Sequence, residues 1–195
     1  MLIRDERLDD HEAVRSLHRR AFGGAHGDVV AGLVDALRRD DPATSSASST
    51  ASSMASPVAS FVAEEAGDVV GHVMFSRCLL DAPRRLVEVA SLSPLAVDPR
   101  QQRRGVGSAL IHHGLRDLDK RGVPLVFLEG DPRYYSRAGF RPAVEHGFRK
   151  PSLRIPDAAF QVVMLSGYEP WMAGTFVYSD TFWRLDCVGL RDEST

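Results

Sequence analysis

The stretch that decides the fold is LAVDPRQQRRGVGSAL, residues 95–110. It begins as an apolar, β-prone strand, breaks at Asp98-Pro99, crosses a loop rich in Arg and Gln, and enters a helix through Gly105 and Gly107. A glycine-rich turn at a helix start leaves backbone N–H groups unpaired, and the helix dipole adds partial positive charge there. Such a turn binds phosphate or pyrophosphate. The alternative is that both glycines serve only a tight strand-to-helix turn.

The segments on either side extend this stretch into a β-loop-α-β unit over residues 86–128. Residues 86–97 predict a strand, and the helix after the glycines carries an apolar stripe and stops at Gly122. The apolar run at 123–128 has the composition of a strand buried on both faces. The first and last strands of the unit are therefore expected to be parallel around the helix.

Other elements follow from the same kinds of pattern. Asp9-Asp10-His11-Glu12 predicts a helix start of the capping-box type, and Gly23-Gly24 predicts its end. Asp131-Pro132 predicts a short helix with Asp as N-cap, which stops at Gly139. Further strands are expected at 2–4, 58–63, 69–80, 159–165 and 175–178, and a second helix through 29–37.

Composition indicates an ordinary soluble globular protein. The chain has 195 residues, 44% of them hydrophobic, with a formal net charge of −2, which argues against binding to nucleic acid or to an anionic membrane. No apolar run reaches the ~20 residues of a membrane span, and the N-terminus is charged where a signal peptide is apolar. Cys78 and Cys187 show no metal-ligand or redox spacing. These features predict a reduced, cytoplasmic protein without a metal.

One domain is expected over residues 1–195. The Ser- and Ala-rich segment 43–56 has almost nothing to bury and is predicted to be a loop within that domain, dispensable for folding. The C-terminal extension 159–195 is rich in aromatic residues. Three roles are open for these aromatic residues: lining an acceptor pocket, forming a homodimer interface, or packing in a core. Core packing is the favoured interpretation. The aromatic residues are Trp171, Phe176, Tyr178, Phe182 and Trp183.

Two motifs resemble those of one enzyme family. Residues 102–107, QRRGVG, are similar to the Q/R-x-x-G-x-G/A signature of the GNAT superfamily of acyl-CoA-dependent N-acetyltransferases, and Tyr135 stands before Gly139-Phe140 as in its second signature. The likeness extends to bacterial predicted N-acetyltransferases with a Pro-Leu-Ala-Val strand and a Gly-Asp-Pro-x-Tyr-Tyr segment, here 94–97 and 130–135. Covering about residues 2–182, the resemblance implies an α/β, GNAT-like fold, a mixed, mostly antiparallel sheet flanked by helices.

The resemblance also implies roles for individual residues. Acetyl-CoA is the implied cosubstrate, with its pyrophosphate on the loop amides and its pantetheine arm and thioester carbonyl on the free backbone of the preceding strand. Tyr135 is the implied general acid that protonates the departing thiolate, whereas Tyr134 is expected to pack or contact substrate. The implied cofactor-binding residues are Leu95, Ala96, Val97, Gln102, Arg103, Arg104, Gly105, Val106, Gly107 and Ser108.

Two positions depart from the family pattern. Many members have an Asn seven residues before the Tyr, where this chain has Leu128, and some have a Glu at the position of Ser91. The general base is therefore left open among several groups and a water chain. These groups are Glu129, Asp131 and His26. Glu88 is only three residues from Ser91, but strand alternation puts it on the opposite face of the strand.

The favoured function is transfer of an acetyl group from acetyl-CoA to an amine of a small molecule or peptide. Nothing in the loops identifies the acceptor, because acceptor loops vary on one scaffold. The alternative is a non-catalytic acyl-CoA-binding regulatory module on the same fold. A nucleotide-binding domain is disfavoured, since the glycines are not followed by the Lys-Ser/Thr of a P-loop and the third glycine of a dinucleotide fingerprint is absent.

Overall fold

The structure is a computed structural model that describes residues 1–39 and 57–191. The predicted loop 43–56 lies outside these residues. The chain forms two compact units, the first from Met1–Arg77 with Leu92–Leu118 and the second from Cys78–Ser91 with Asp119–Thr195. Strands β3 (Asp68–Asp81) and β4 (Leu86–Val97) contribute to both units. The single-domain organisation stays a prediction.

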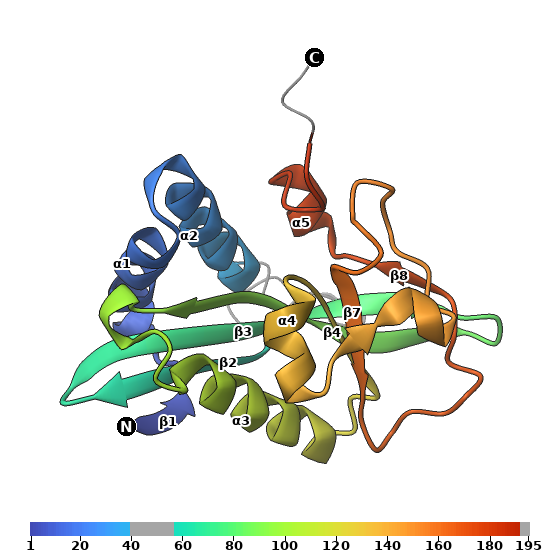
Figure 1. The fold of residues 1–195 in the computed structure, drawn as a ribbon, viewed down its shortest axis with the longest axis horizontal. Coiled ribbons are helices and arrows are strands. Elements are labelled where there is room, and N and C mark those ends of the chain that lie inside the picture. Colours follow the sequence, from blue (N-terminus) through green and yellow to red (C-terminus); the bar gives the residue numbers. More distant parts are fainter. Residues whose placement is uncertain (40–56, 192–195) are drawn as a thin grey trace, which may run out of the picture. The chain divides into compact units, whose positions relative to one another are not determined.

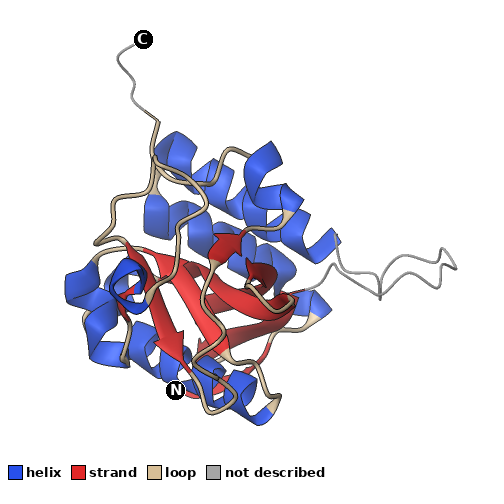
Figure 2. Ribbon diagram, turned by 90° about the vertical axis from the view of Figure 1, so that its right-hand side faces the viewer, coloured by secondary structure: helices blue, strands red, loops and turns tan. Residues whose placement is uncertain are grey.

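The predicted fold class is confirmed as α/β. Strand pairing runs in the order β1-β2-β3-β4-β5-β7-β6, with β8 beside β3, and most pairs are antiparallel. Helices lie beside the strands (Figure 2). Among residues 1–39 and 57–191, no helix is long and apolar enough to cross a membrane. No cluster of three His, Cys, Asp or Glu side chains that could hold a metal occurs in that part of the chain.

The first unit combines antiparallel strands with helices (Figure 1). Strands β1 (Leu2–Asp5) and β2 (Pro57–Glu65) pair through Ile3 and Ala63, and β2 pairs with β3 through Phe61 and Val73. The short turn η1 (Leu8–Asp10) leads into the neighbouring helices α1 (His11–Phe22) and α2 (Gly24–Arg39). Gly23, with φ of 68°, separates these helices as predicted.

The predicted capping of α1 is wrong in its detail. The N-cap is Asp10, not the acid three residues before Glu12, and its carboxylate makes no cap bond to the helix. It accepts instead from the guanidinium of Arg4, at 2.6 and 2.9 Å, and from the backbone N–H of Arg7 at 2.7 Å. The charged partner wins because a bidentate, charge-assisted pair is stronger than a neutral N–H donor.

Helix α3 (Val106–Lys120) packs closely on β3 through two glycines. A Cβ at Gly114 would lie 2.1 Å from the ring of Phe75, and a Cβ at Gly71 would lie 2.9 Å from side-chain atoms of Val106 and Leu110. Phe75 and Leu110 are fully buried. These contacts fix the start of α3, and with it the loop that precedes the helix.

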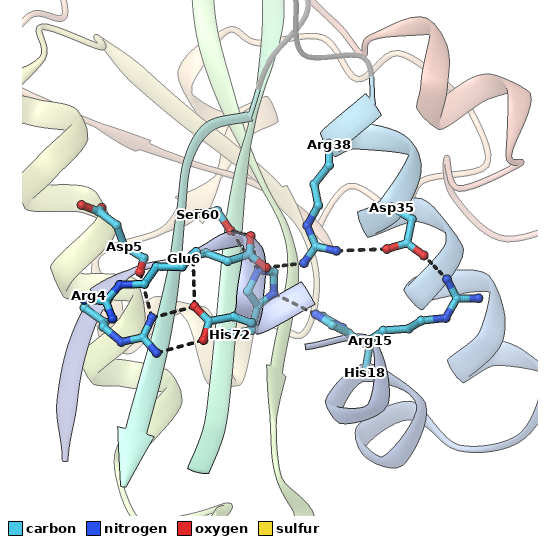
Figure 3. Close-up of polar contacts among 11 residues, drawn as sticks. Arg4, Asp5, Glu6, Arg15, His18, Asp35, Arg38, Ser60 and His72 are labelled. Atoms are coloured by element: carbon cyan, nitrogen blue, oxygen red, sulfur yellow. Dashed lines mark hydrogen bonds and ion pairs between the residues drawn. The ribbon is translucent and has the colours of Figure 1, made fainter. Parts of the chain in front are cut away.

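A chain of polar side chains crosses the first unit between sheet and helices (Figure 3). Glu6 forms an ion pair with Arg38 and accepts from the Ser60 hydroxyl at 2.7 Å. Because that hydroxyl proton points to Glu6, His72 must donate its Nε2–H to Ser60, 2.9 Å away. His72 Nδ1 is then the acceptor for Nε2–H of His18, at 2.8 Å. Both histidines are fully buried and are thereby fixed as neutral tautomers.

The second unit has its own sheet and an aromatic core. Strand β5 (Leu125–Glu129) pairs in parallel with β4 and antiparallel with β7 (Phe160–Met164). The ring of Phe127 lies 4.6–5.5 Å from those of Phe148, Phe160 and Phe176.

The remaining elements are η2 (Pro99–Gln101) of the first unit, and α4 (Pro132–Tyr135), η3 (Ser136–Ala138), β6 (Arg141–Pro142), η4 (Ala143–His146), β8 (Thr175–Val177) and α5 (Asp180–Arg184) of the second.

The C-terminal aromatic residues mostly belong to that core. Phe176, Tyr178 and Phe182 are buried, which supports core packing over a pocket or an interface for these three. Trp183 is 40% exposed. The guanidinium groups of Arg84 and Arg85 each lie 5.3 Å from the centroid of the Trp171 ring.

Candidate active site

The loop after β4 is anchored at its first residue. Asp98 is buried; its N–H donates to the carbonyl of Val70 at 2.9 Å, and its carboxylate accepts from the N–H of Arg100 at 3.0 Å. Hydrogen bonds from the side chain of Arg100, and a further one from that of Arg20, lower the pKa of Asp98 to about 2. An ionised, multiply bonded Asp98 therefore fixes where the strand ends and the loop begins.

The loop backbone turns into α3 through two residues with left-handed conformations. Arg103 has φ of 60° and Gly105 has φ of 87°. A Cβ at Gly105 would meet no atom within 4 Å, so this glycine is required by its conformation, and the space beside it is open. Since α3 begins at Val106, the N–H groups of its first turn have no partner within the helix. This geometry fits a phosphate group, and the fifteen-residue helix adds its dipole.

The side chains of the loop divide into two kinds. The Gln102 amide donates to the carbonyl of Val97 at 3.2 Å, and the Ser108 hydroxyl lies 3.3 Å from Nδ1 of His112. These two side chains are used within the protein. Arg103 and Arg104 are exposed, and Arg104 also bonds to Gln101. The two guanidiniums thus stand on the solvent side of the turn, where they would strengthen anion binding.

The strand that leads into this loop is the end of β4. Ala96 is buried, whereas Leu95 and Val97 are half-buried. All residues implied as cofactor-binding, 95–97 and 102–108, thus lie in the first unit. Tyr135 lies in the second unit.

Tyr135 is held by the turn that precedes it. Asp131 caps α4 by accepting from the N–H of Arg133 at 2.9 Å, as predicted, and Gly139 ends the following turn with φ of 91°. The Tyr135 ring packs against the backbone of Gly130, where a Cβ would lie 2.4 Å from Cε2, and lies 6.0 Å from the ring of Phe140. Burial raises the pKa of Tyr135 well above its usual value, so its hydroxyl stays protonated at neutral pH.

The groups left open as a general base have different surroundings. Ser91 is buried, and Glu88 is exposed. The bonds from Arg133 lower the pKa of Asp131, which weakens Asp131 as a base. His26 packs edge-on to the ring of Phe22.

Glu129 has the environment most suited to a base. Its carboxylate accepts from the Tyr178 hydroxyl and from the N–H of Gly189, and burial raises its pKa. The sequence did not predict the bonds from Tyr178 and Gly189 to Glu129. Tyr178 was expected only as one of the C-terminal aromatic residues, and Gly130 only as part of the Gly-Asp-Pro-x-Tyr-Tyr segment.

Comparison with known families decides the class of protein. Residues 3–143 match the family model described as acetyltransferase (GNAT) domain. The chain belongs to the GNAT acetyltransferase family. It is therefore an acetyl-CoA-dependent N-acetyltransferase by class.

Individual GNAT proteins resemble the chain over most of its length. The uncharacterized N-acetyltransferase YjhQ of Escherichia coli (strain K12) is 33% identical over 144 residues, which is 73% of this chain and 71% of that protein. The crystal structure of the GNAT N-acetyltransferase YhbS from Escherichia coli, in complex with CoA, is 30% identical with a TM-score of 0.77 and covers 94% of this chain and 92% of its own. A GNAT acetyltransferase from Brucella melitensis in complex with acetyl-CoA is 29% identical with a TM-score of 0.68, covering 93% and 97%.

Proposed function

We propose that this GNAT acetyltransferase transfers the acetyl group of acetyl-CoA to a primary amine of a small molecule or peptide. The observation that carries the proposal is the turn into α3, where Gly105 is left-handed, the space beside it is open, and the first-turn N–H groups would be free to bind a phosphate. The CoA and acetyl-CoA complexes of the relatives from Escherichia coli and Brucella melitensis support the choice of ligand.

The pyrophosphate of CoA would be held by the N–H groups from Arg103 to Ser108, with Arg103 and Arg104 adding charge-assisted contacts. The backbone of residues 95–97 at the end of β4 would bind the pantetheine arm, and one of its N–H groups would stabilise negative charge on the acetyl oxygen. When bound, acetyl-CoA supplies an acetyl group activated as a thioester.

Tyr135 is proposed to hold the proton that the departing sulfur requires. The raised pKa of this half-buried tyrosine keeps that proton on the Oη atom at neutral pH. A phenol with a pKa near 10 is a weaker acid than a thiol near 8.5. Donation by Tyr135 is therefore favourable only when it is coupled to loss of the far more acidic proton of the newly acylated amine.

The proposal is tested with the purified chain, acetyl-CoA and a panel of small-molecule and peptide amines. Free thiol release and the mass of the acetylated amine report transfer. Acetyl-CoA is also expected to raise the Tm with ligand concentration, by mass action, far more than NAD or ATP does. Stabilisation by acetyl-CoA without acetylation of any amine would favour the regulatory-module alternative. No stabilisation at all would contradict the assignment of the loop.

A further inference from the structure

We propose that the side chains of Arg84, Arg85 and Trp171 form a docking surface for an acidic peptide segment of a partner protein, whose carboxylates the two guanidinium groups bind. All three residues belong to the second unit. The inference does not depend on the proposed function, because these residues lie outside the loop, the strand and the tyrosine that acetyl transfer is proposed to use.

Two cations converge on one aromatic ring in this surface. Arg84 and Arg85 stand in the turn between β3 and β4 (Figure 1), and the Cζ atom of each lies 5.3 Å from the centroid of the Trp171 ring. The two Cζ atoms are therefore at most twice that distance apart. Each guanidinium gains a cation–π attraction, whereas the two like charges repel each other. Anionic groups bound to both guanidiniums would offset this repulsion.

The segment that carries Trp171 is held against the turn by its backbone. Thr175 pairs with Asp81 at the end of β3, and a Cβ at Gly174 would lie 2.0 Å from the carbonyl oxygen of Asp81. Met172 is buried, and Trp171 itself is half-buried. The indole ring is thus fixed beside the turn, where its contacts with the two arginine side chains limit their freedom before any partner binds.

The N–H groups of both arginines are left for a partner outside the chain. Arg84 and Arg85 are exposed, and neither forms a hydrogen bond or an ion pair with another residue that the structure describes. By contrast, Arg133, Arg154 and Arg184 of the same unit each pair with a carboxylate. A cation–π contact leaves most N–H donors of a guanidinium unused, in a planar fork that matches a carboxylate.

The charges near the turn favour a short acidic segment over a nucleic acid. Arg149, whose side chain donates to Thr175, adds a third exposed guanidinium on a neighbouring segment. Asp81 and Glu169 are exposed carboxylates close to these residues in the chain, and they would repel a continuous polyanion. In an extended peptide, the carboxylates of residues i and i+2 lie on one side about 7 Å apart. The upper limit on the separation of the two guanidiniums allows this spacing.

The test uses the Trp183→Phe variant, because Trp171 is then the one tryptophan of the chain and its fluorescence reports on the surface directly. The probe is a peptide of alternating Glu and Gly, blocked at both ends so that it carries no free amine. The control peptide has Gln in place of Glu. At low ionic strength the Glu peptide should change the fluorescence of Trp171 saturably, and added salt should weaken its binding. The Gln peptide should not bind.

Two double variants in that background test which feature of the arginines matters. Arg84→Gln with Arg85→Gln should raise the Kd of the Glu peptide about tenfold, measured by calorimetry. Arg84→Lys with Arg85→Lys keeps both charges but loses the planar forks, so it should also weaken binding. Both pairs of changes are at exposed positions, and the Tm should stay close to that of the parent.

A third double variant is the matched control for charge. Arg39→Gln with Arg116→Gln removes two exposed guanidiniums, one from α2 and one from α3, and should bind the Glu peptide like the parent. The Kd values of the two Gln double variants therefore separate a defined surface from general attraction between opposite charges.

Three results would overturn the docking surface. The first is a parent protein that does not bind the Glu peptide at low ionic strength. The second is an equal rise in Kd in the two Gln double variants, and the third is a Gln peptide that binds as tightly as the Glu peptide. A single-stranded oligonucleotide that binds more tightly than the Glu peptide would overturn the acidic peptide as the partner and assign the surface to nucleic acid.

Discussion

Tyr135 packs directly on the backbone of Gly130, so closely that a Cβ at Gly130 would lie 2.4 Å from Cε2 of the tyrosine ring. Gly130 therefore sets where the phenol stands. A glycine that follows a buried strand is usually explained by turn geometry. Here the reason is the space that the ring occupies.

Gly130→Ala is expected to displace the Tyr135 ring and lower kcat at least tenfold, because a general acid must stand within hydrogen-bond reach of the atom it protonates. Acetyl-CoA binding, measured by the shift in Tm, should change little. In a Tyr135→Phe background the same glycine substitution should lower kcat no further. Independent, additive losses in the double variant would show that Gly130 does not act through Tyr135.

Gly105→Val should abolish the stabilisation by acetyl-CoA, because a β-branched side chain would occupy the open space beside the loop amides. Gly67→Val in the β2–β3 turn is the matched control. Gly67 has φ of 88° and equally open surroundings, so both variants carry a similar backbone strain. Thermal unfolding with and without acetyl-CoA separates them: only Gly105→Val should lose the ligand effect. Equal responses in the two variants would exclude the loop as the pyrophosphate site.

The contact between Gly114 and Phe75 predicts a strong difference between two glycines in helices. Gly114→Ala should destabilise the protein by about 1–3 kcal/mol, because the new Cβ would overlap the buried ring of Phe75. Gly32→Ala in α2 meets no atom within 4 Å and should stabilise by about 0.5–1 kcal/mol through helix propensity. Urea unfolding measures both, and a neutral Gly114→Ala would contradict the close packing of α3 on β3.

The buried chain from Glu6 to His18 predicts loss of stability in acid. Burial lowers the pKa of His18 from 6.5 to about 2. Burial alone would raise that of Glu6, but contacts with His72, Arg38 and Ser60 hold it at about 2, below 4.5. The unfolded chain therefore binds more protons below pH 6.5, and the free energy of unfolding should fall from there toward pH 2.

Two variants assign the parts of that acid dependence. His18→Leu should lessen the fall between pH 6.5 and 4.5, to which His72 also contributes because burial lowers its pKa too. Glu6→Gln should lessen the part below pH 4.5, and both are measured by urea unfolding at several pH values. A slope between pH 6.5 and 4.5 that His18→Leu leaves unchanged would show that this histidine is not held neutral in the folded protein.

Much of the fold was predictable because its signals are local. The strand-loop-helix-strand unit follows from apolar runs bounded by Asp98-Pro99, Gly105 and Gly122, and the structure places β4, α3 and β5 there. The short helix after Asp131 follows from its N-cap and its stop at Gly139 in the same way. Each element is marked by residues at or next to its own ends.

The polar networks were not predictable because they join distant residues. Glu6, His18, Ser60 and His72 come from four separate segments, and no spacing marks them as partners. The bonds of Glu129 to Tyr178 and Gly189 span 49 and 60 residues.

The most direct test of the account is the kcat of Tyr135→Phe beside that of Tyr134→Phe, at saturating acetyl-CoA with an amine from the panel. Tyr135→Phe keeps the ring and removes the proton that sulfur would receive, so kcat should fall by about 10²–10⁴-fold with little change in Tm or acetyl-CoA binding. Tyr134, which is 40% exposed, projects about 100° away around the helix, and its variant should be nearly as active as the parent. Full activity in both variants would contradict the assignment of Tyr135 as the general acid.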